Sequence, residues 1–592
     1  MNGSRRSAWW PTSSRGAGLP GFRPYLLHPL ALAPGGLFLF RVGLGLVLLK
    51  DLLAMLPWWG AFFSDGGLLE REQVMALAPP RVPLFFGSDL WNGALYGLLI
   101  LLALAFTLGI RARWTGLLAG VLALGLMDRN PWLWNTGHSL VPALLLLAAL
   151  LPLEAGPGFD RALLRRPPPP SLVSVGALPF LLLLLAAYVV NAAAKDIGSY
   201  FLRGDAVAGA LVSSHGSVLG VELMERFPGL LPWLSRYTFL VEAGAPFLLL
   251  LPLWPLRLLG LVLLMSLHVG FALFLDVGHF PFVMLSALAL LLPPQVFRLP
   301  RRRALPEAVV HYDGGCGFCR RVAEVLTGLL LARARLVPAE GEARALMEAR
   351  RSWVVEVEGQ AYTEGRGFQG LLLASPLRPL ALLWRLPGFP WLADRAYRLV
   401  ADRRPSLGWT RAYLPARDLH PNPPWAVLLA LAFTGLYGHL SWEGLVTDYR
   451  GVRPEVSTTL ASIGLDLRWG HFAPKPPGRA DWVQAQGVTV SGRTVDPWRW
   501  TLLGDPAYRV EVPRYPVLLS GGEHWRKFWW GAWRPGKANE ARWTGLALYL
   551  CDRWNAVHGG ADRLHTVTLY HGQAMPGAKA PVLRPMRNEV CP

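Results

Sequence analysis

The sequence predicts a multi-pass α-helical membrane bundle of about eight spans, then a soluble domain, one further span and a small β-containing C-terminal domain. Composition supports a membrane protein, because 53% of the 592 residues are hydrophobic and only 16% are charged. Soluble chains contain about 25% charged residues. Apolar runs fill the first half of the chain and shorten after about residue 304. The four cysteines are too few for a disulfide scaffold.

Eight apolar segments before residue 295 are candidate membrane helices, because a span needs about 20 apolar residues and shorter spans occur in bundles. They define a transmembrane domain over residues 31–295, which follows an N-terminal segment, 1–30. The segments are 35–57, 91–109, 114–127, 139–153, 172–194, 237–254, 256–277 and 279–293.

The formal net charge of +19 has two explanations. Basic chains can bind nucleic acid, but arginines in loops also orient membrane helices. With a cytoplasmic N-terminus, the inner segments hold about twice as many basic residues as the outer loops. We therefore expect no nucleic-acid partner and a multi-pass protein of a bacterial-type cytoplasmic (inner) membrane.

The second half alternates soluble and apolar regions. Residues 304–418 predict a strand–turn–helix domain, which lies in the cytoplasm if the number of preceding spans is even. Residues 424–442 form a ninth, slightly polar candidate span that carries the C-terminus outside. Short alternating runs over 450–592 predict a small β-containing domain.

Ionisable residues within predicted membrane helices are functional candidates, because a charge in lipid is costly. Simpler roles exist for some of them. Arg41 and Lys195 lie near helix ends and can extend to the interface, and Lys50 and Asp51 can neutralise each other. The candidates are Arg41, Lys50, Asp51, Lys195, Glu242 and His268.

Lys195 is the only lysine between Asp51 and residue 300. A desolvated lysine can act as a neutral base, which arginine cannot do. His138 lies in a predicted outer loop and has a structural role as its alternative. The alternative for His268 is a hydrogen bond between helices. All three fall in the outer half of the predicted topology, so one shared pocket is possible.

The order of several loose motifs over about 25–295 resembles the HTTM family, whose membrane domains are related to vitamin K-dependent gamma-carboxylase. The motifs are Phe40-Arg41 with Gly45, Asn130-Pro131 with Asn135-Thr-Gly-His138, Lys195 with Gly204-Asp205-Ala206, Glu242 near Pro246-Phe247, and His268-Val-Gly with Gly278-His279-Phe280.

This resemblance implies a membrane enzyme that oxygenates a reduced quinone and uses the resulting base on a glutamate γ-carbon before carboxylation. Lys195 matches the base that deprotonates the hydroquinone, and His138 resembles the carboxylase histidine near that chemistry. The cofactor implied is a reduced quinone, for which the candidate binding residues are His268, Arg41 and Glu242.

Cys316 and Cys319 form a CxxC that follows a predicted strand and opens a predicted helix. The helix N-terminus, together with Arg320 and Arg321, favours the thiolate form. A CxxC can also be half of a zinc site, but such a site needs another ligand pair. Because Cys551 and Cys591 are expected across the membrane, we expect no metal.

The wider sequence over about 307–412 resembles the DCC family of thiol–disulfide oxidoreductase-like proteins. This resemblance implies a thioredoxin-like fold with a redox-active pair, Cys316 as the attacking thiol and Cys319 as the resolving thiol. It names no substrate. The matching residues are Tyr312-Asp313-Gly-Gly-Cys316-Gly-Phe-Cys319, Leu386-Pro-Gly-Phe-Pro-Trp391, Asp394, Tyr397 and Asp402-Arg403.

Two features of the C-terminal domain remain open. Cys551 and Cys591 can pair in an oxidising outer compartment, and the alternative is a buried free Cys551 with a frayed tail. The segment Trp469-Gly-His-Phe-Ala-Pro474-Lys-Pro476 favours a packing role.

Three hypotheses for function follow. The first is an integral membrane redox enzyme that combines quinol chemistry in the bundle with the CxxC domain. The second is a membrane-tethered thiol–disulfide oxidoreductase whose bundle is an anchor or a quinone site. The third is a non-enzymatic assembly or transport factor. The expected partners are the lipid bilayer, a quinone-like small molecule, and a protein thiol or glutamate substrate.

Overall fold

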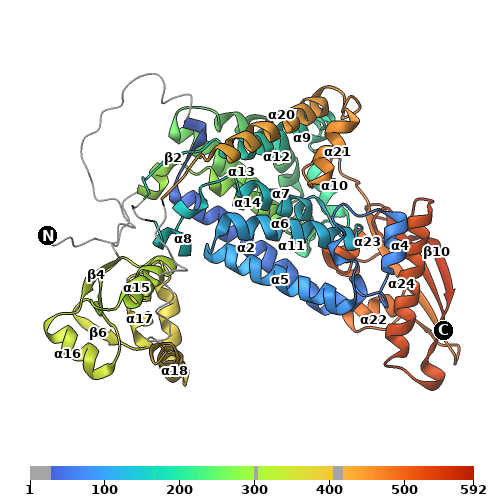
Figure 1. Cartoon of the computed structure of the whole chain (residues 1–592). Helices are drawn as coiled ribbons and strands as arrows, with labels where there is room; N and C mark the ends of the chain where they lie inside the picture. Colours follow the sequence, from blue (N-terminus) through green and yellow to red (C-terminus); the bar gives the residue numbers. More distant parts are fainter. Residues whose placement is uncertain (1–27, 165, 167, 299–304, 404–417) are drawn as a thin grey trace.

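The computed structural model describes residues 28–164, 166, 168–298, 305–403 and 418–592. A helical bundle occupies the centre of the molecule, and two sheet-containing domains lie at opposite ends of it (Figure 1). The domain of residues 305–403 lies at one end, and the C-terminal domain lies at the other. Most of the predicted N-terminal segment, residues 1–27, lies outside the described residues.

Each of the eight predicted apolar segments contains a helix. Side chains begin two of these helices: Ser88 accepts a hydrogen bond from the Trp91 amide, and Asn135 accepts one from the His138 amide. The helices are α2 (Pro34–Met55), α5 (Asp89–Leu108), α6 (Ala112–Arg129), α7 (Thr136–Ala148), α9 (Ala177–Ala193), α12 (Leu231–Leu248), α13 (Trp254–Phe274) and α14 (Phe280–Leu290).

Shorter elements connect the bundle helices. They are α3 (Trp59–Phe62), α4 (Arg71–Leu77), α8 (Phe159–Ala162), α10 (Ala206–Val212), α11 (Val218–Arg226) and an antiparallel pair of short strands, β1 (Ala31–Leu32) and β2 (Leu172–Val173).

Within the described residues, three helices are long and apolar enough to cross a membrane: α5, α13 and α20 (Pro424–Val446). The sequence predicted about eight spans, but only these three helices of the described residues meet the length and composition of a span. One reason is charge, because α2 contains Arg41, Lys50 and Asp51. The other is length, because α7, α9 and α14 have 13, 17 and 11 residues, fewer than the roughly 20 that a span needs.

The domain of residues 305–403 alternates strands and helices around one mixed sheet. The sheet order is β4-β3-β5-β6, with β3 parallel to β4 and antiparallel to β5. Its apolar core is separate from that of the bundle. The elements are β3 (Ala308–Tyr312), α15 (Gly317–Leu329), β4 (Ala334–Pro338), α16 (Gly341–Arg350), β5 (Val354–Val357), β6 (Gln360–Thr363), α17 (Arg366–Leu373) and α18 (Phe389–Ala401).

The C-terminal domain contains an antiparallel sheet of order β10-β9-β7-β8. Its apolar core is continuous with that of the bundle, and a disulfide joins Cys551 to Cys591. Of the two open alternatives for these cysteines, the structure has the paired one. The elements are α21 (Pro454–Ser462), β7 (Ala480–Thr489), β8 (Thr494–Val495), α22 (Pro497–Leu503), α23 (Gly522–Trp529), α24 (Lys537–Asn555), β9 (Leu564–Ala574) and β10 (Val582–Val590).

Candidate functional site

The CxxC lies in a tight turn between β3 and α15, as the sequence predicts. Asp313 shapes the turn by accepting two hydrogen bonds, one on its backbone carbonyl and one on its carboxylate. Its backbone carbonyl accepts the Cys316 amide at 3.0 Å, and its carboxylate accepts the Gly315 amide at 3.0 Å. The turn therefore places Cys316 directly before the first residue of α15.

Cys316 is the N-cap residue of α15. Its Sγ accepts a hydrogen bond from the Cys319 amide at 3.2 Å. Both cysteines are half-buried and reduced. The Cys316 sulfur therefore lies at the positive end of the α15 dipole. The two cysteines are three positions apart on the first turn of this helix.

The expected effect of Arg320 and Arg321 on the thiol requires a correction. Glu324 accepts hydrogen bonds from both arginines, at 3.1 Å from Arg320 and 2.8 Å from Arg321. Arg321 also donates to the Ala162 carbonyl on α8 at 3.4 Å. Glu324 therefore offsets the charge of both arginines, and the α15 N-terminus is the feature that contacts Cys316 Sγ directly.

Two motif residues of the predicted DCC segment have structural roles. The Asp394 carboxylate accepts the Gly365 amide at 2.9 Å. The Tyr397 hydroxyl accepts the Trp353 amide at 3.1 Å. Both bonds attach α18 to the β5–β6 side of the domain, so these residues support the fold around the CxxC.

A second candidate site is a cavity of about 780 Å³ between the bundle and the C-terminal domain. Lys195, Glu242 and His268 all line it. Its size and its mostly apolar lining suit a small organic ligand. The structure therefore brings Lys195 and His268 into one pocket, as the sequence suggested.

Lys195 is buried and forms an ion pair with Glu242. Glu242 also accepts the Asn191 side-chain amide at 3.1 Å, and the Lys195 ammonium lies 4.5 Å from the centre of the Tyr200 ring. Lys195 therefore does not extend to the interface. The pair places a proton donor and a proton acceptor side by side in the cavity wall.

His268 is also buried, and its Nε2 lies 2.7 Å from the Tyr188 hydroxyl on α9. This is the hydrogen bond between helices that the sequence offered as the simpler role. His268 also lines the cavity that Lys195 lines, so its side chain can contact a ligand there.

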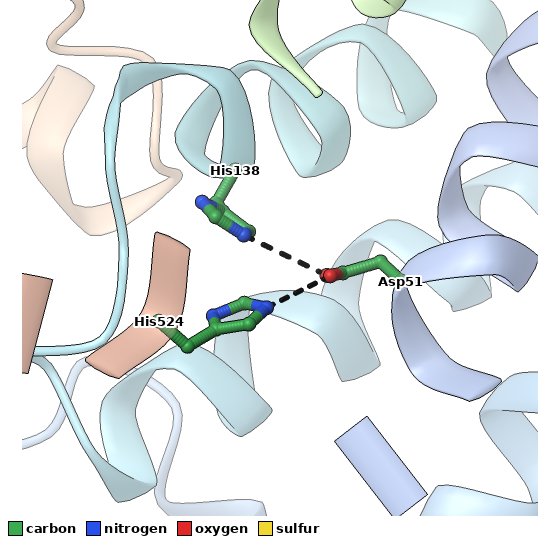
Figure 2. Close-up of side chains that lie close together, drawn as sticks. All are labelled: Asp51, His138 and His524. Atoms are coloured by element: carbon green, nitrogen blue, oxygen red, sulfur yellow. Dashed lines mark hydrogen bonds and ion pairs between the residues drawn. The ribbon is translucent and has the colours of Figure 1, made fainter. Parts of the chain in front are cut away.

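His138 is placed elsewhere. Among the described residues that line the cavity are its neighbours Thr136 and Gly137, but not His138 itself. Its ring faces Asp51 and lies beside His524 (Figure 2). His524 Nε2 lies 2.9 Å from Asp51 Oδ1. Asp51 thus faces histidines, and Lys50 is exposed, so they do not form an isolated neutral pair.

Arg41 lies apart from both sites. It is buried in α2, and its guanidinium donates to the Pro157 carbonyl. Gly109 and Gly158 lie against the same guanidinium, because a Cβ on either glycine would come within 2.6 Å of it. Arg41 therefore fastens two loops of the bundle and does not line the cavity.

The sequence analysis missed the contribution of the C-terminal domain to the cavity. His471, Lys527 and Arg526 also line the cavity, and His471 lies 2.6 Å from the Thr136 hydroxyl. Burial and the charges of Lys527 and Lys195 lower the pKa of His471 to about 4, so its ring is neutral at neutral pH. The Trp-and-Pro segment that contains His471 was the only sequence signal for this contribution.

Comparison with known proteins identifies one region of the chain. No curated protein and no solved structure matches the chain. Residues 310–410 match the family model of the DCC1-like thiol-disulfide oxidoreductases, and this range contains Cys316 and Cys319. The match supports an oxidoreductase role for this domain and does not extend to the bundle.

Proposed function

We propose that this protein is a membrane-tethered thiol–disulfide oxidoreductase in which Cys316 and Cys319 react. The observation that carries the proposal is the position of Cys316 Sγ at the N-terminus of α15, 3.2 Å from the Cys319 amide. The family match over 310–410 supports the same activity. The order of strands and helices, with the sheet order β4-β3-β5-β6, supports a thioredoxin-like fold.

The proposed reaction transfers two electrons and two protons. The Cys316 thiolate attacks one sulfur of a substrate disulfide and forms a mixed disulfide with it, and the other substrate sulfur leaves as a thiolate that takes up a proton. The Cys319 thiolate then attacks Cys316 and releases the second substrate thiol. A dithiol reductant must reduce the resulting Cys316–Cys319 disulfide before the next turnover.

We further propose that the bundle is embedded in a membrane with the CxxC domain in the cytoplasm and the C-terminal domain outside. The three apolar helices support the membrane location. The positions of the two domains at opposite ends of the bundle support their separation (Figure 1). Impermeant thiol labelling of whole cells tests the arrangement, and labelling of Cys316 from outside would contradict it.

Reduction of a small aromatic disulfide by the purified full chain, with a dithiol as reductant, tests the redox proposal. Cys316→Ser should abolish turnover. Cys319→Ser should also block turnover but should accumulate the mixed disulfide on Cys316, which mass spectrometry detects. Turnover in both variants at the wild-type rate would overturn the proposal. The two variants are matched controls, since they remove one sulfur each from the same turn.

A second candidate function is quinol chemistry in the cavity, which the grouping of Lys195, Glu242 and His268 favours. Lys195 would deprotonate a reduced quinone after passing its own proton to Glu242. His268 and Tyr188 would shape the pocket. His138, which does not line the cavity, would act only through the Asn135–Gly137 segment. The gamma-carboxylase-like reaction implied by the HTTM resemblance belongs to this candidate.

Oxygen uptake by the purified protein with a reduced naphthoquinone tests this candidate. Uptake that is lost in Lys195→Ala and kept in Cys316→Ser would support quinol oxygenation in the cavity. No uptake by a wild-type protein that still reduces disulfides would overturn it. In that case the bundle is an anchor for the CxxC domain.

A further inference from the structure

Three histidines and two carboxylates meet in a buried cluster between the bundle and the C-terminal domain. They come from four places: Asp51 on α2, His138 on α7, His279 directly before α14, and Glu523 and His524 on α23. Asp51, His138 and His279 are only 8%, 3% and 2% exposed. Neither candidate function uses this cluster.

The three imidazoles face Asp51 with the same ring nitrogen. The Nε2 atoms of His524, His279 and His138 lie 2.9, 3.5 and 3.8 Å from the Asp51 carboxylate. Ligands about 2.1 Å from a tetrahedral ion lie roughly 3.4 Å from one another. The ligand atoms of Asp51, His138 and His524 all lie within 4.8 Å of one another (Figure 2), and those of His138, His279 and Glu523 form a second such group. The spacing therefore suits one ion held by the Asp51 carboxylate and the Nε2 atoms of His138 and His524.

The opposite ring nitrogens face oxygen atoms. His138 Nδ1 lies 3.4 Å and His279 Nδ1 lies 3.7 Å from the Glu523 carboxylate, and His524 Nδ1 lies 3.4 Å from the Leu133 carbonyl. A proton on each Nδ1 leaves Nε2 with a free lone pair. Histidines that bind metals are usually held in this way by an outer carboxylate or carbonyl.

Asn135 makes further contacts with His138 and Glu523. Its side-chain oxygen lies 3.0 Å from His138 Nδ1, and its side-chain amide donates to Glu523. The Asn135 backbone amide donates to His138 Nδ1 at 3.2 Å, so two oxygens and one N–H surround that nitrogen. Metal binding requires the other tautomer, in which Nδ1 donates to one of the oxygens and Nε2 is available to an ion.

The cluster contains polar atoms that have no other partner. Within the described part of the chain, His138 Nε2 and both ring nitrogens of His279 are buried and accept or donate no hydrogen bond. Buried polar atoms without partners are costly. An ion bound by His138 Nε2 satisfies one of them, and the Asp51 and Glu523 carboxylates balance its double positive charge.

We propose that Asp51, His138 and His524 bind one divalent first-row transition metal ion, with His279 and Glu523 as the positioning residues beside the histidines. Two imidazoles and one carboxylate suit Zn²⁺ and its neighbours better than Mg²⁺ or Ca²⁺. Three protein ligands leave the fourth position of a tetrahedral site open. Since the ligands come from the bundle and from α23, the ion fastens the C-terminal domain to the bundle. The sequence analysis expected no metal because it considered only the cysteines.

The metal content of the full chain tests this proposal. The protein is purified in detergent, equilibrated with Zn²⁺ at one buffered free concentration, and measured by mass spectrometry. Wild type should hold about one Zn²⁺ per chain. His138→Gln and His524→Gln should hold at least about tenfold less. His565→Gln removes an exposed histidine of the same domain and should match wild type. Equal zinc in all four proteins, or less than about a tenth of an ion in wild type, would overturn the proposal.

Two further measurements do not depend on the folding of those variants. Wild-type protein loaded with Co²⁺ should show ligand-field bands that Zn²⁺ abolishes, and absence of these bands would overturn the site. Glu523→Gln should keep the stoichiometry but weaken zinc affinity by about 10- to 100-fold, because it removes the outer carboxylate. Unchanged affinity would remove Glu523 from the proposal.

Discussion

The domain of residues 305–403 and the C-terminal domain each contain a four-stranded sheet, but they join the bundle in different ways. The first has its own apolar core, which includes Val310, Val355 and Leu371. The second shares its core with the bundle through Trp525, which packs 5.3 Å from Trp58 and 4.7 Å from Phe62 between ring centres.

This difference determines what kind of site each domain carries. The CxxC lies on one turn of one helix and needs no residue from the bundle. The cavity and the histidine cluster lie where the C-terminal domain meets the bundle, so each needs side chains from both. A domain with a separate core can therefore carry a local site, and a shared core can place distant residues in one site.

Trp525→Ala should give the largest effect on this shared core. Removal of a buried tryptophan costs about 3–5 kcal/mol of unfolding free energy. The bundle and the C-terminal domain should lose stability together, which protease resistance of both segments during heating measures. Trp391→Ala is the control, because that ring is 63% exposed on α18 and surface changes stay within about 0.5 kcal/mol. Wild-type resistance of the C-terminal segment in Trp525→Ala would contradict the shared core.

Glu242→Gln should have a comparable effect by a different mechanism. It leaves the Lys195 ammonium buried without its carboxylate, which costs about 3–5 kcal/mol. Chemical unfolding in detergent measures the loss. A Lys195→Met/Glu242→Met double variant should recover most of it, because it buries no charge. If the double variant is as unstable as the single one, the ion pair is not the cause.

Cys591→Ser should destabilise only the C-terminal side. The disulfide joins residues 40 positions apart, and loss of such a link costs about 2–4 kcal/mol. Thermal unfolding should show the shift, while the CxxC domain should keep its wild-type rate of disulfide reduction. Cys316→Ser is the matched control, with no expected change in the stability of the C-terminal domain. A reduced rate in Cys591→Ser would show that the two domains are coupled.

Asp313→Ala should have the smallest effect, confined to the domain with the separate core. It removes the hydrogen bond from the Gly315 amide, worth about 1 kcal/mol. Asp313→Asn keeps an acceptor and should remain close to wild type. Unfolding of residues 305–403, followed by proteolysis, distinguishes them. Equal losses in both variants would show that charge, and not the hydrogen bond, holds the turn.

Much of the fold could be predicted because it depends on local patterns. The apolar runs predicted the position of each bundle helix, and the strand before Asp313 predicted the turn that holds Cys316. The number of membrane spans could not be predicted in the same way. Arg41 and Asp51 are tolerated in α2 because they are buried inside the molecule, and the short helices α7, α9 and α14 bury most of their residues.

The candidate sites also differ in whether a local sequence pattern could predict them. The sequence by itself determined the CxxC, because two thiols three positions apart on one helical turn must lie together. It also identified Lys195 and His268 as candidates, because each is an ionisable residue at the end of or within an apolar segment. Only the tertiary structure decided that His138 faces Asp51, His279 and His524. Asp51 and His524 are 473 positions apart in the chain. No local pattern sets the distance between residues that meet only when the C-terminal domain packs on the bundle.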